Sequence, residues 1–202
     1  MRKEYPGPFA GVRVGFALTG SFCTFDAAFE CMEALVERGA SLTPIISYNV
    51  DMLDTKFGTA DANKKRLTEI TGKPIIHTLT GAEPIGPGRL LDVLVIIPAT
   101  GNTLAKLAAG IADTPVTMAA KSHLRNGGPV VLGISSNDAL AGGAANIGQL
   151  LATRNIYFVP FGQDAPLEKP RSIVFIKERV LPAIEAALLG VQVQPVITAT
   201  PA

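Results

Sequence analysis

Hydrophobic and polar positions alternate along the chain in two recurring patterns. Short, nearly continuous apolar runs, of which 92–98 is the clearest, indicate strands that are buried on both faces. Between such runs apolar residues recur every three or four positions, as over 26–38, which is typical of amphipathic helices. Strands that alternate with helices predict an α/β fold with three layers and a doubly wound parallel sheet. The predicted strands are 12–18, 42–47, 75–77, 92–98, 130–134 and 156–160, and the predicted helices are 26–38, 61–71, 103–112, 116–125, 144–153 and 172–188.

The length of the chain favours one domain. With 202 residues it falls in the range of single domains, so we expect one domain over 1–202. Residues 1–10 form a lead-in with two prolines and no strong pattern. The tail that starts near 191 is rich in Pro and Thr, and we expect it to be flexible or docked on a partner.

The charge balance excludes several classes of partner. The chain has 18 Lys and Arg residues against 17 Asp and Glu, a formal net charge of +1. Nucleic acids and anionic membranes both select a basic surface, so neither is expected as a partner. No apolar run approaches the ~20 residues of a membrane-spanning helix. Charged residues make up only 17% and hydrophobic residues 48%, which predicts a homo-oligomer whose protomers cover apolar surface.

The two cysteines, Cys23 and Cys31, are expected to be reduced thiols. On one helix they would lie too far apart for a disulfide, which fits a cytoplasmic protein. Neither has a partner residue at metal-ligand spacing, so no metal site is expected.

Polar side chains gather where three predicted strands end. They occur at 19–21, at 98–103 and at 135–138. In doubly wound sheets ligands bind outside the carboxyl ends of the strands. Glycine and hydroxyl groups before a helix suit a phosphate, although the same residues can simply cap that helix. Three such loops at neighbouring strand ends together predict a binding rim.

The titratable residues near the strand ends are few. His77 follows a short predicted strand, and His123 lies within a predicted helix. A single histidine is either structural or catalytic, and the pattern alone leaves both open. Lys106, Lys121 and Arg125 are cations that either face solvent or pair with an anionic ligand.

Several motifs resemble one known family. The segment 93–117, VLVIIPATGNTLAKLAAGIADTPVT, resembles the signature of the cysteine decarboxylase-like flavoproteins, a family that includes phosphopantothenoylcysteine decarboxylase, the lantibiotic decarboxylases and the flavin prenyltransferases. The family motif P-A-S-A-N-T corresponds to 98–103, and G-x-T-G-S corresponds in part to 17–21, with Ala17 in place of the glycine. Over roughly 11–197 the chain is similar to a narrower branch, the B subunits of dipicolinate synthases, through strings such as SSNDAL at 135–140 and FVPFGQDAP at 158–166.

The family resemblance implies a Rossmann-like flavoprotein fold that binds FMN. Carried over by position, it makes His77 and Asn137 the candidate catalytic residues. The decarboxylases have a P-x-M-N-x-x-M-W substrate clamp, of which only Asn137 matches here, and the chain has no Trp. The candidate cofactor-binding residues are Thr19, Gly20 and Ser21 at the FMN phosphate, Ser47 as a further hydroxyl, Pro98, Thr100, Asn102 and Thr103 at the sheet edge, and Ser135 and Ser136 near the ring.

The narrower branch implies an oxidoreductase. Its members convert dihydrodipicolinate, or its hydrated precursor, to dipicolinate during sporulation, in the cytoplasm of the mother cell. The resemblance implies a partner, the A subunit of dipicolinate synthase, with its own dinucleotide-binding fold that could bring NADP. It also implies a homo-oligomer that is either a trimer or an assembly of trimers. The small dicarboxylate substrate requires cations, for which Lys106, Lys121 and Arg125 are candidates. Two alternatives stay open, a non-catalytic protein that stabilises the A subunit, or an outlying FMN-dependent decarboxylase or flavin prenyltransferase.

Overall fold

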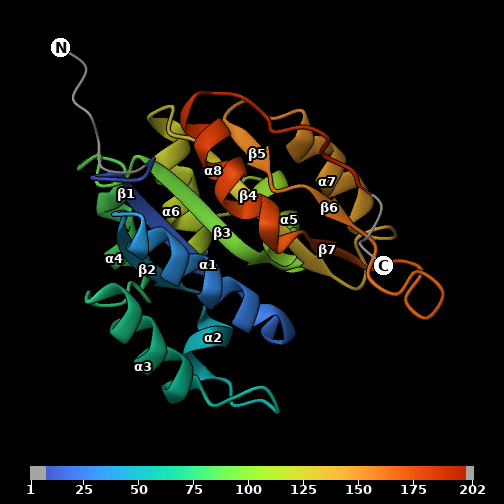
Figure 1. Cartoon of the computed structure of the whole chain (residues 1–202), viewed down its shortest axis with the longest axis horizontal. Helices are drawn as coiled ribbons and strands as arrows, with labels where there is room; N and C mark the ends of the chain where they lie inside the picture. The colour runs from blue at the N-terminus through green and yellow to red at the C-terminus, as the bar shows by residue number, and fades with distance from the viewer. Residues whose placement is uncertain (1–7, 199–202) are drawn as a thin grey trace.

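A parallel sheet forms the centre of the molecule (Figure 1). The structure, a computed structural model, describes residues 8–198. Neighbouring strands pair in the order β2-β1-β3-β4, and β5 pairs with the first half of β4. The parallel strands are β1 (Arg13–Leu18), β2 (Ser41–Ile46), β3 (Val93–Ala99), β4 (Val130–Ser136) and β5 (Ile156–Phe158).

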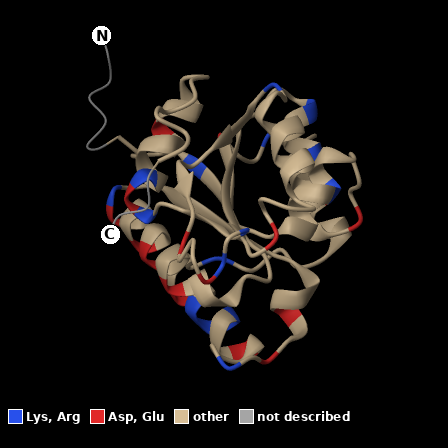
Figure 2. Cartoon of the chain, turned by 90° about the vertical axis from the view of Figure 1, so that its right-hand side faces the viewer, with Lys and Arg blue, Asp and Glu red and all other residues tan. Residues whose placement is uncertain are grey.

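The buried strands have the composition that predicted them. All seven residues of β3 are buried, and its side chains alternate between two apolar cores, one on each face of the sheet. Arg13 is the only charged residue within the described strands, whereas charged residues lie on the outer helices and loops (Figure 2). Burial on both faces is what a parallel sheet requires, because helices cover it above and below.

Helices cover both faces of the sheet, so the predicted three layers are confirmed. One core contains residues of α1 (Phe25–Glu37), α3 (Ala60–Thr71) and α8 (Val180–Leu188). The other contains residues of α4 (Leu79–Ala82), α5 (Gly101–Ala108), α6 (Pro115–Arg125) and α7 (Ala144–Leu151). The short elements are α2 (Tyr48–Met52) and the 3-10 turns η1 (Phe22–Thr24), η2 (Glu83–Ile85) and η3 (Lys177–Arg179).

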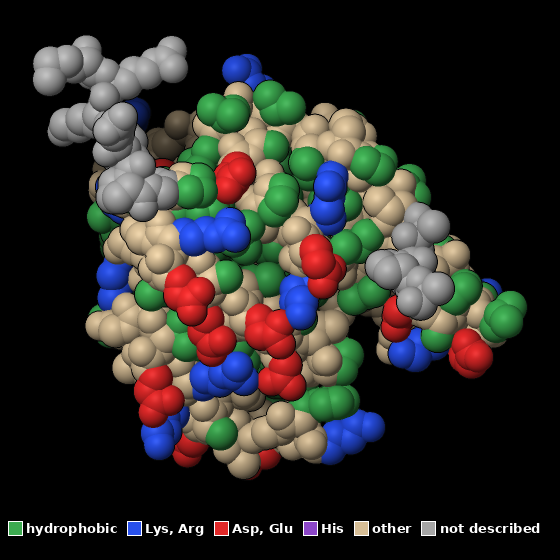
Figure 3. All heavy atoms as spheres, viewed as in Figure 1, with side chains coloured by type: hydrophobic (Ala, Val, Ile, Leu, Met, Phe, Trp, Pro, Cys, Tyr) green, Lys and Arg blue, Asp and Glu red, His purple; other side chains and the backbone are tan. Residues whose placement is uncertain are grey.

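The exposed side of the first helical layer carries paired charges. Acidic and basic side chains lie side by side over α1 and α3 (Figure 3). Arg66 of α3 pairs with both Asp26 and Glu33 of α1. These exposed pairs each contribute little stability, so this layer is held to the sheet by its apolar face.

Two predicted elements differ from the observed ones. The predicted helix 172–188 is wrong in its first part, where β7 (Ile173–Phe175) precedes α8. Strand β7 runs antiparallel to β4 and to β6 (Phe161–Gly162), so the seven-stranded sheet is mixed rather than purely parallel. The β-branched and aromatic residues of β7 favour a strand over a helix. The predicted strand 75–77 is reduced to one bridge, between Ile45 and Ile76.

The described part of the tail lies on its own chain. The Phe161 N–H donates to the Val196 carbonyl (2.9 Å), and the Thr198 N–H donates to the Phe161 carbonyl (3.1 Å). The Gln192 side chain pairs with both backbone groups of Phe158, at 2.7 and 2.8 Å. Residues 191–198 therefore follow the edge of the sheet at β6. Residues 1–7 of the predicted lead-in (1–10) and residues 199–202 of the tail lie outside the described residues.

The order of the strands in the sheet predicts where a ligand would bind. From β1 the chain passes to β2 on one side, and β3 lies on the other side of β1. The connections that leave β1 and β3 therefore diverge, which opens a crevice at their carboxyl ends. In this architecture that crevice is where a ligand binds.

We predict opposite effects on stability for two Gly→Ala substitutions. At Gly133 in β4 an added Cβ would lie 2.7 Å from Cγ1 of buried Ile97, so Gly133→Ala should lower the free energy of unfolding by about 1–3 kcal/mol. At Gly148 in α7 nothing lies within 4 Å of the added atom, so Gly148→Ala should raise it by about 0.5–1 kcal/mol. Urea denaturation of both proteins measures these differences. Equal stability of Gly133→Ala and the parent would contradict the close packing of β4 on β3.

Candidate functional site

A cavity of about 250 Å³ lies at the crevice between β1 and β3. Four structures wall it: the loop after β1, α5 after β3, the start of α2 after β2, and the start of α6. The wall combines hydroxyl, amide and ammonium groups. Its residues are Thr19, Gly20, Ser47, Tyr48, Asn49, Thr100, Asn102, Thr103, Lys106 and Thr114.

A buried threonine ties the two strand ends together. Thr19 is 1% exposed, and its hydroxyl donates to the Pro98 carbonyl at 2.7 Å. The same oxygen accepts a hydrogen bond from the Thr100 N–H at 3.1 Å. Thr100 in turn accepts from the Thr103 N–H at 3.3 Å and so caps α5. The loops at 19–21 and 98–103 are thus one hydrogen-bonded unit.

The cap assigned by the structure corrects one expectation. A helix over the predicted range 103–112 would have Asn102 as its N-cap, but α5 begins at Gly101 and Thr100 occupies the N-cap position. Asn102 is the second residue of α5, is exposed, and lines the cavity. Its amide is therefore available to a ligand without any loss of the cap.

The hydroxyl of Ser47 supplies an independent sign that a ligand binds here. Ser47 precedes α2 and lines the cavity. Its Oγ is buried, yet it has no hydrogen-bond partner among residues 8–198. A buried hydroxyl without a partner costs about 1–3 kcal/mol, so a polar ligand atom at this point would be stabilised. The donor set, hydroxyls with backbone N–H groups at the start of α5, fits a phosphate-bearing cofactor.

A second group of hydroxyls lies beside the cavity, where β1 and β4 end. Ser21 Oγ lies 2.7 Å from Ser135 Oγ, and Thr24 donates to the same Ser135 oxygen at 3.4 Å. Ser136 lies close to Gly101, where an added Cβ would be 3.0 Å from Ser136 Oγ. The structure therefore brings all three predicted loops together, as the parallel strands require.

The two candidate catalytic residues lie outside the cavity wall. Asn137 is exposed and accepts a hydrogen bond from Ser172 at 3.3 Å, which links it to the start of β7. His77 is half-exposed and contacts Asp51 of α2. A catalytic role for either residue stays a prediction.

Among the three candidate cations only Lys106 lines the cavity. Its ammonium lies 2.8 Å from both carboxylate oxygens of Asp113. Hydrogen bonding to Lys106 lowers the pKa of Asp113, and burial opposes this effect only in part. Lys121 and Arg125 line a different, apolar groove between α5 and α6.

Sequence reasoning missed the contribution of α2. Tyr48 and Asn49 line the cavity, but α2 has only five residues and no apolar periodicity. The one signal in the sequence is a serine followed by polar residues after a predicted strand. Thr114, the cap of α6, was also missed, although the Thr-Pro pair at 114–115 is a typical helix start.

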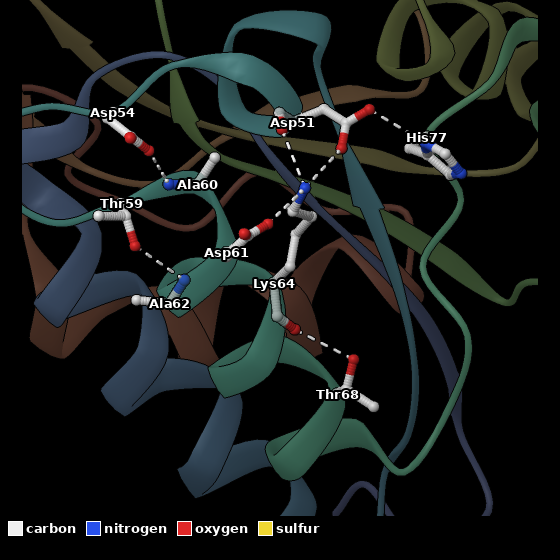
Figure 4. Close-up of polar contacts among 9 residues, drawn as sticks. All are labelled: Asp51, Asp54, Thr59, Ala60, Asp61, Ala62, Lys64, Thr68 and His77. Carbon is white, nitrogen blue, oxygen red and sulfur yellow. Dashed lines mark hydrogen bonds and ion pairs between the residues drawn. The ribbon is translucent and has the colours of Figure 1, made fainter.

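The Asp51 carboxylate contacts His77 through one oxygen and Lys64 through the other (Figure 4). His77 Nδ1 lies 3.0 Å from Asp51 Oδ2, and Lys64 donates to Asp51 Oδ1 at 3.3 Å. Lys64 also contacts the Asp51 carbonyl (3.1 Å) and the Asp61 carboxylate (3.1 Å). Burial alone would raise the pKa of Asp51, but hydrogen bonds from His77 and Lys64 outweigh it and lower the pKa. The ionised carboxylate therefore holds the proton of neutral His77 on Nδ1, which leaves Nε2 as the basic nitrogen.

Comparison with known proteins identifies the class. The model of the Flavoprotein family matches residues 2–160, so the chain belongs to this family. The chain is similar to the B subunit of dipicolinate synthase from Bacillus subtilis, with 46% identity over 93% of this chain and 94% of the relative. The crystal structure of the dipicolinate synthase B subunit from Bacillus halodurans C has a TM-score of 0.87 at 50% identity, and the match covers 94% of this chain and 97% of that chain. The predicted resemblance and fold class are confirmed.

More distant structures share the fold alone. DmrB of Burkholderia xenovorans, solved in complex with FMN, has a TM-score of 0.58 at 21% identity over 73% of this chain and 87% of its own. Within residues 8–198 no helix is long and apolar enough to cross a membrane. The same part of the chain has no cluster of His, Cys, Asp and Glu that could hold a metal ion.

We predict that Asp51→Asn reverses the tautomer of His77. The Lys64 ammonium can only donate, so it attracts the oxygen of the introduced amide and turns the amide NH₂ toward His77. That NH₂ donates to Nδ1, which forces the ring proton onto Nε2. The ¹⁵N chemical shifts of the ring, at a pH where it is neutral, report the tautomer. Asp61→Asn is the control and should keep the Nδ1–H form; an unchanged tautomer in Asp51→Asn would contradict the interpretation.

Proposed function

We propose that this chain is the FMN-binding subunit of a dipicolinate synthase and that it acts together with a second protein, the A subunit of that enzyme. The observation that carries the proposal is the hydroxyl-lined cavity at the β1/β3 crevice, with the unpartnered Ser47 oxygen in its wall. The similarity to the B subunit of dipicolinate synthase over 93% of the chain supports the choice of reaction. Bound FMN would supply the two-electron acceptor that aromatisation of a dihydropyridine dicarboxylate needs.

The residues of the cavity suit the phosphate end of FMN. The first backbone N–H groups of α5 carry the positive end of the helix dipole. Thr19 cannot turn its proton to a ligand without leaving the Pro98 carbonyl, so it acts as a support rather than a donor. Ser47 and Asn102 are free to donate, and they are the groups we expect to bind the cofactor directly.

The size of the cavity favours a site that a second protein completes. Small-molecule sites commonly measure about 300–1,000 Å³, and a volume of about 250 Å³ falls below that range. The start of α2 lines the cavity, and exposed apolar side chains follow it: Met52 (67% exposed), Leu53 (45%) and Phe57 (55%). An apolar rim next to a small polar cavity fits coverage by another protein, either a second copy or the A subunit.

The residues of the chain also bear on catalysis. Lys106 is the only one of the candidate cations in the cavity, and Asp113 already balances its charge. A dicarboxylate substrate therefore requires further cations, which the partner protein would supply. His77, whose Nδ1 contacts Asp51, has no hydrogen-bond partner for Nε2 among residues 8–198 and is the chain's candidate proton acceptor for a site in that assembly.

The direct test is an assay of the purified chain with and without the A subunit. Flavin and NADP are added separately, and dipicolinate is followed by its ultraviolet absorbance. We expect the chain to bind FMN and to form product only in the mixture of both proteins. Equal rates for the isolated chain and the mixture would reject the shared site. Failure to bind FMN, with the partner protein stabilised and active only in the complex, would instead identify a non-catalytic stabilising role.

We predict that Gly20→Val weakens FMN binding without unfolding the protein. An added Cβ at Gly20 meets Asn49 only at 3.5 Å, and its backbone does not require glycine, so the chain alone has room for a side chain. Any need for glycine there comes from the ligand, because a bare backbone allows the closest approach. Flavin titration should show a dissociation constant raised at least about tenfold, with an unchanged melting temperature. Gly20→Ala should give a smaller effect; unchanged affinity in both would remove this loop from the site.

We predict that Asn102→Asp separates binding from stability. The carboxylate is favourable in the first turn of α5, so the free energy of unfolding should stay within about 0.5 kcal/mol of the parent. The same charge would repel a phosphate, and FMN affinity should fall at least about tenfold. Thr100→Val is the matched control for cap loss and should cost about 1 kcal/mol of stability. Tight FMN binding by Asn102→Asp would show that this side chain does not face the cofactor.

A further inference from the structure

A second cavity lies at the opposite edge of the sheet, where the parallel strands begin. It measures about 370 Å³, larger than the candidate flavin cavity. Arg13 opens β1, Asp92 directly precedes β3, and Gly128 lies just before β4. His123 comes to the same place from the last turn of α6. The cavity is therefore separate from the crevice at the carboxyl ends.

The wall of this cavity carries one positive charge in excess. Arg13 holds Asp92 through both carboxylate oxygens, at 2.6 and 3.1 Å, and donates to the Arg89 carbonyl at 2.8 Å. The hydrogen bond from Arg13 also lowers the pKa of Asp92, which stays ionised and balanced. The Arg89 guanidinium is exposed and pairs with no carboxylate among residues 8–198. The Arg89 guanidinium is thus available to pair with an anionic ligand.

A buried histidine nitrogen without a partner lies in the wall of the same cavity, against Gly128. His123 lines the cavity and is only 4% exposed, and burial lowers its pKa, which favours the neutral ring. The Pro129 backbone, which hydrogen bonds the ring, has no N–H and can only accept, so it receives the proton of Nδ1. Nε2 is then an acceptor, and within the described chain nothing donates to it. A buried acceptor of this kind is costly unless a donor reaches it.

Asn126, whose amide donates to the Gly86 carbonyl, and three apolar side chains form the remaining wall. Ile85, Leu91 and Leu188 come from η2, from the loop before β3 and from the end of α8. They leave a site with three chemical requirements: an anionic group for Arg89, a hydrogen-bond donor for His123 Nε2, and an apolar body between them. The volume lies within the range of small-molecule sites.

We propose that this cavity is a second binding site, which takes a small organic acid that also carries a hydroxyl or N–H donor. The acid pairs with Arg89, and the donor satisfies His123 Nε2. Asp92 does not repel the acid, because Arg13 already pairs with it. The site lies at the far edge of the sheet from the candidate flavin cavity, so the two can be occupied independently.

Calorimetric titration of the full chain with three matched probes tests the proposal. The probes are 3-hydroxybenzoate, benzoate, which lacks the donor, and 3-hydroxybenzyl alcohol, which lacks the charge. We expect 3-hydroxybenzoate to bind about 3- to 10-fold more tightly than benzoate, and the alcohol to bind least. Arg89→Gln should weaken 3-hydroxybenzoate binding at least about tenfold, whereas the exposed Arg154→Gln should leave it unchanged.

A second measurement does not depend on a variant. The ¹⁵N signal of His123 Nε2 should move when 3-hydroxybenzoate is added and should respond less to benzoate. His123→Phe, if its melting temperature is retained, should abolish the preference for the hydroxylated probe. Binding that is equal in the parent and Arg89→Gln, or an Nε2 signal that no probe moves, would overturn the proposal and leave a cavity that holds water only.

Discussion

The hydroxyl of Thr19 is the contact on which the candidate site depends. It donates to the Pro98 carbonyl and accepts from the Thr100 N–H, so a single oxygen fixes the end of β1 against the end of β3. The two backbone groups that it satisfies lie where the ladder between these strands has ended and would otherwise be unpaired. Because Thr100 also caps α5, the same oxygen sets where that helix begins and where its free N–H groups point. The crevice thus owes its shape to a side chain that is almost entirely buried.

The sequence predicted the buried parts of the fold well. The strand predicted at 92–98 is apolar at every position after Asp92, and such a run is typical of a strand covered on both faces. The helices α1 and α6 followed from their apolar spacing and their ends. Elements that depend on tertiary context were missed. Strand β7 has three residues and depends on its pairing with the last two residues of β4, and α2 is too short to show a period.

The candidate site was predictable in its loops but not in its details. Three polar loops at strand ends indicated the correct edge of the sheet, because parallel strands bring their carboxyl ends together. The sequence did not show which side chains support the loops and which face the cavity. Thr100 rather than Asn102 caps α5, because the helix begins at Gly101 and not at 103 as predicted. Ser47 Oγ lacks a hydrogen-bond partner because of how the chain packs around α2, and the local sequence does not show that packing.

The double attachment of β1 to β3 has a consequence for motion. Arg13 and Asp92 join the two strands where they begin, and Thr19 joins them to Pro98 and Thr100 where they end. Since a strand rises about 3.3 Å per residue, these ties lie about 20 Å apart and brace the whole length of the pair. We therefore expect the centre of the sheet to be its most rigid part. Larger displacements are expected in the elements beside it, such as α2 and the protruding segment 163–172, whose Leu167 is 91% exposed (Figures 1 and 3). The strand pair at the centre would then keep its geometry while these peripheral segments adjust.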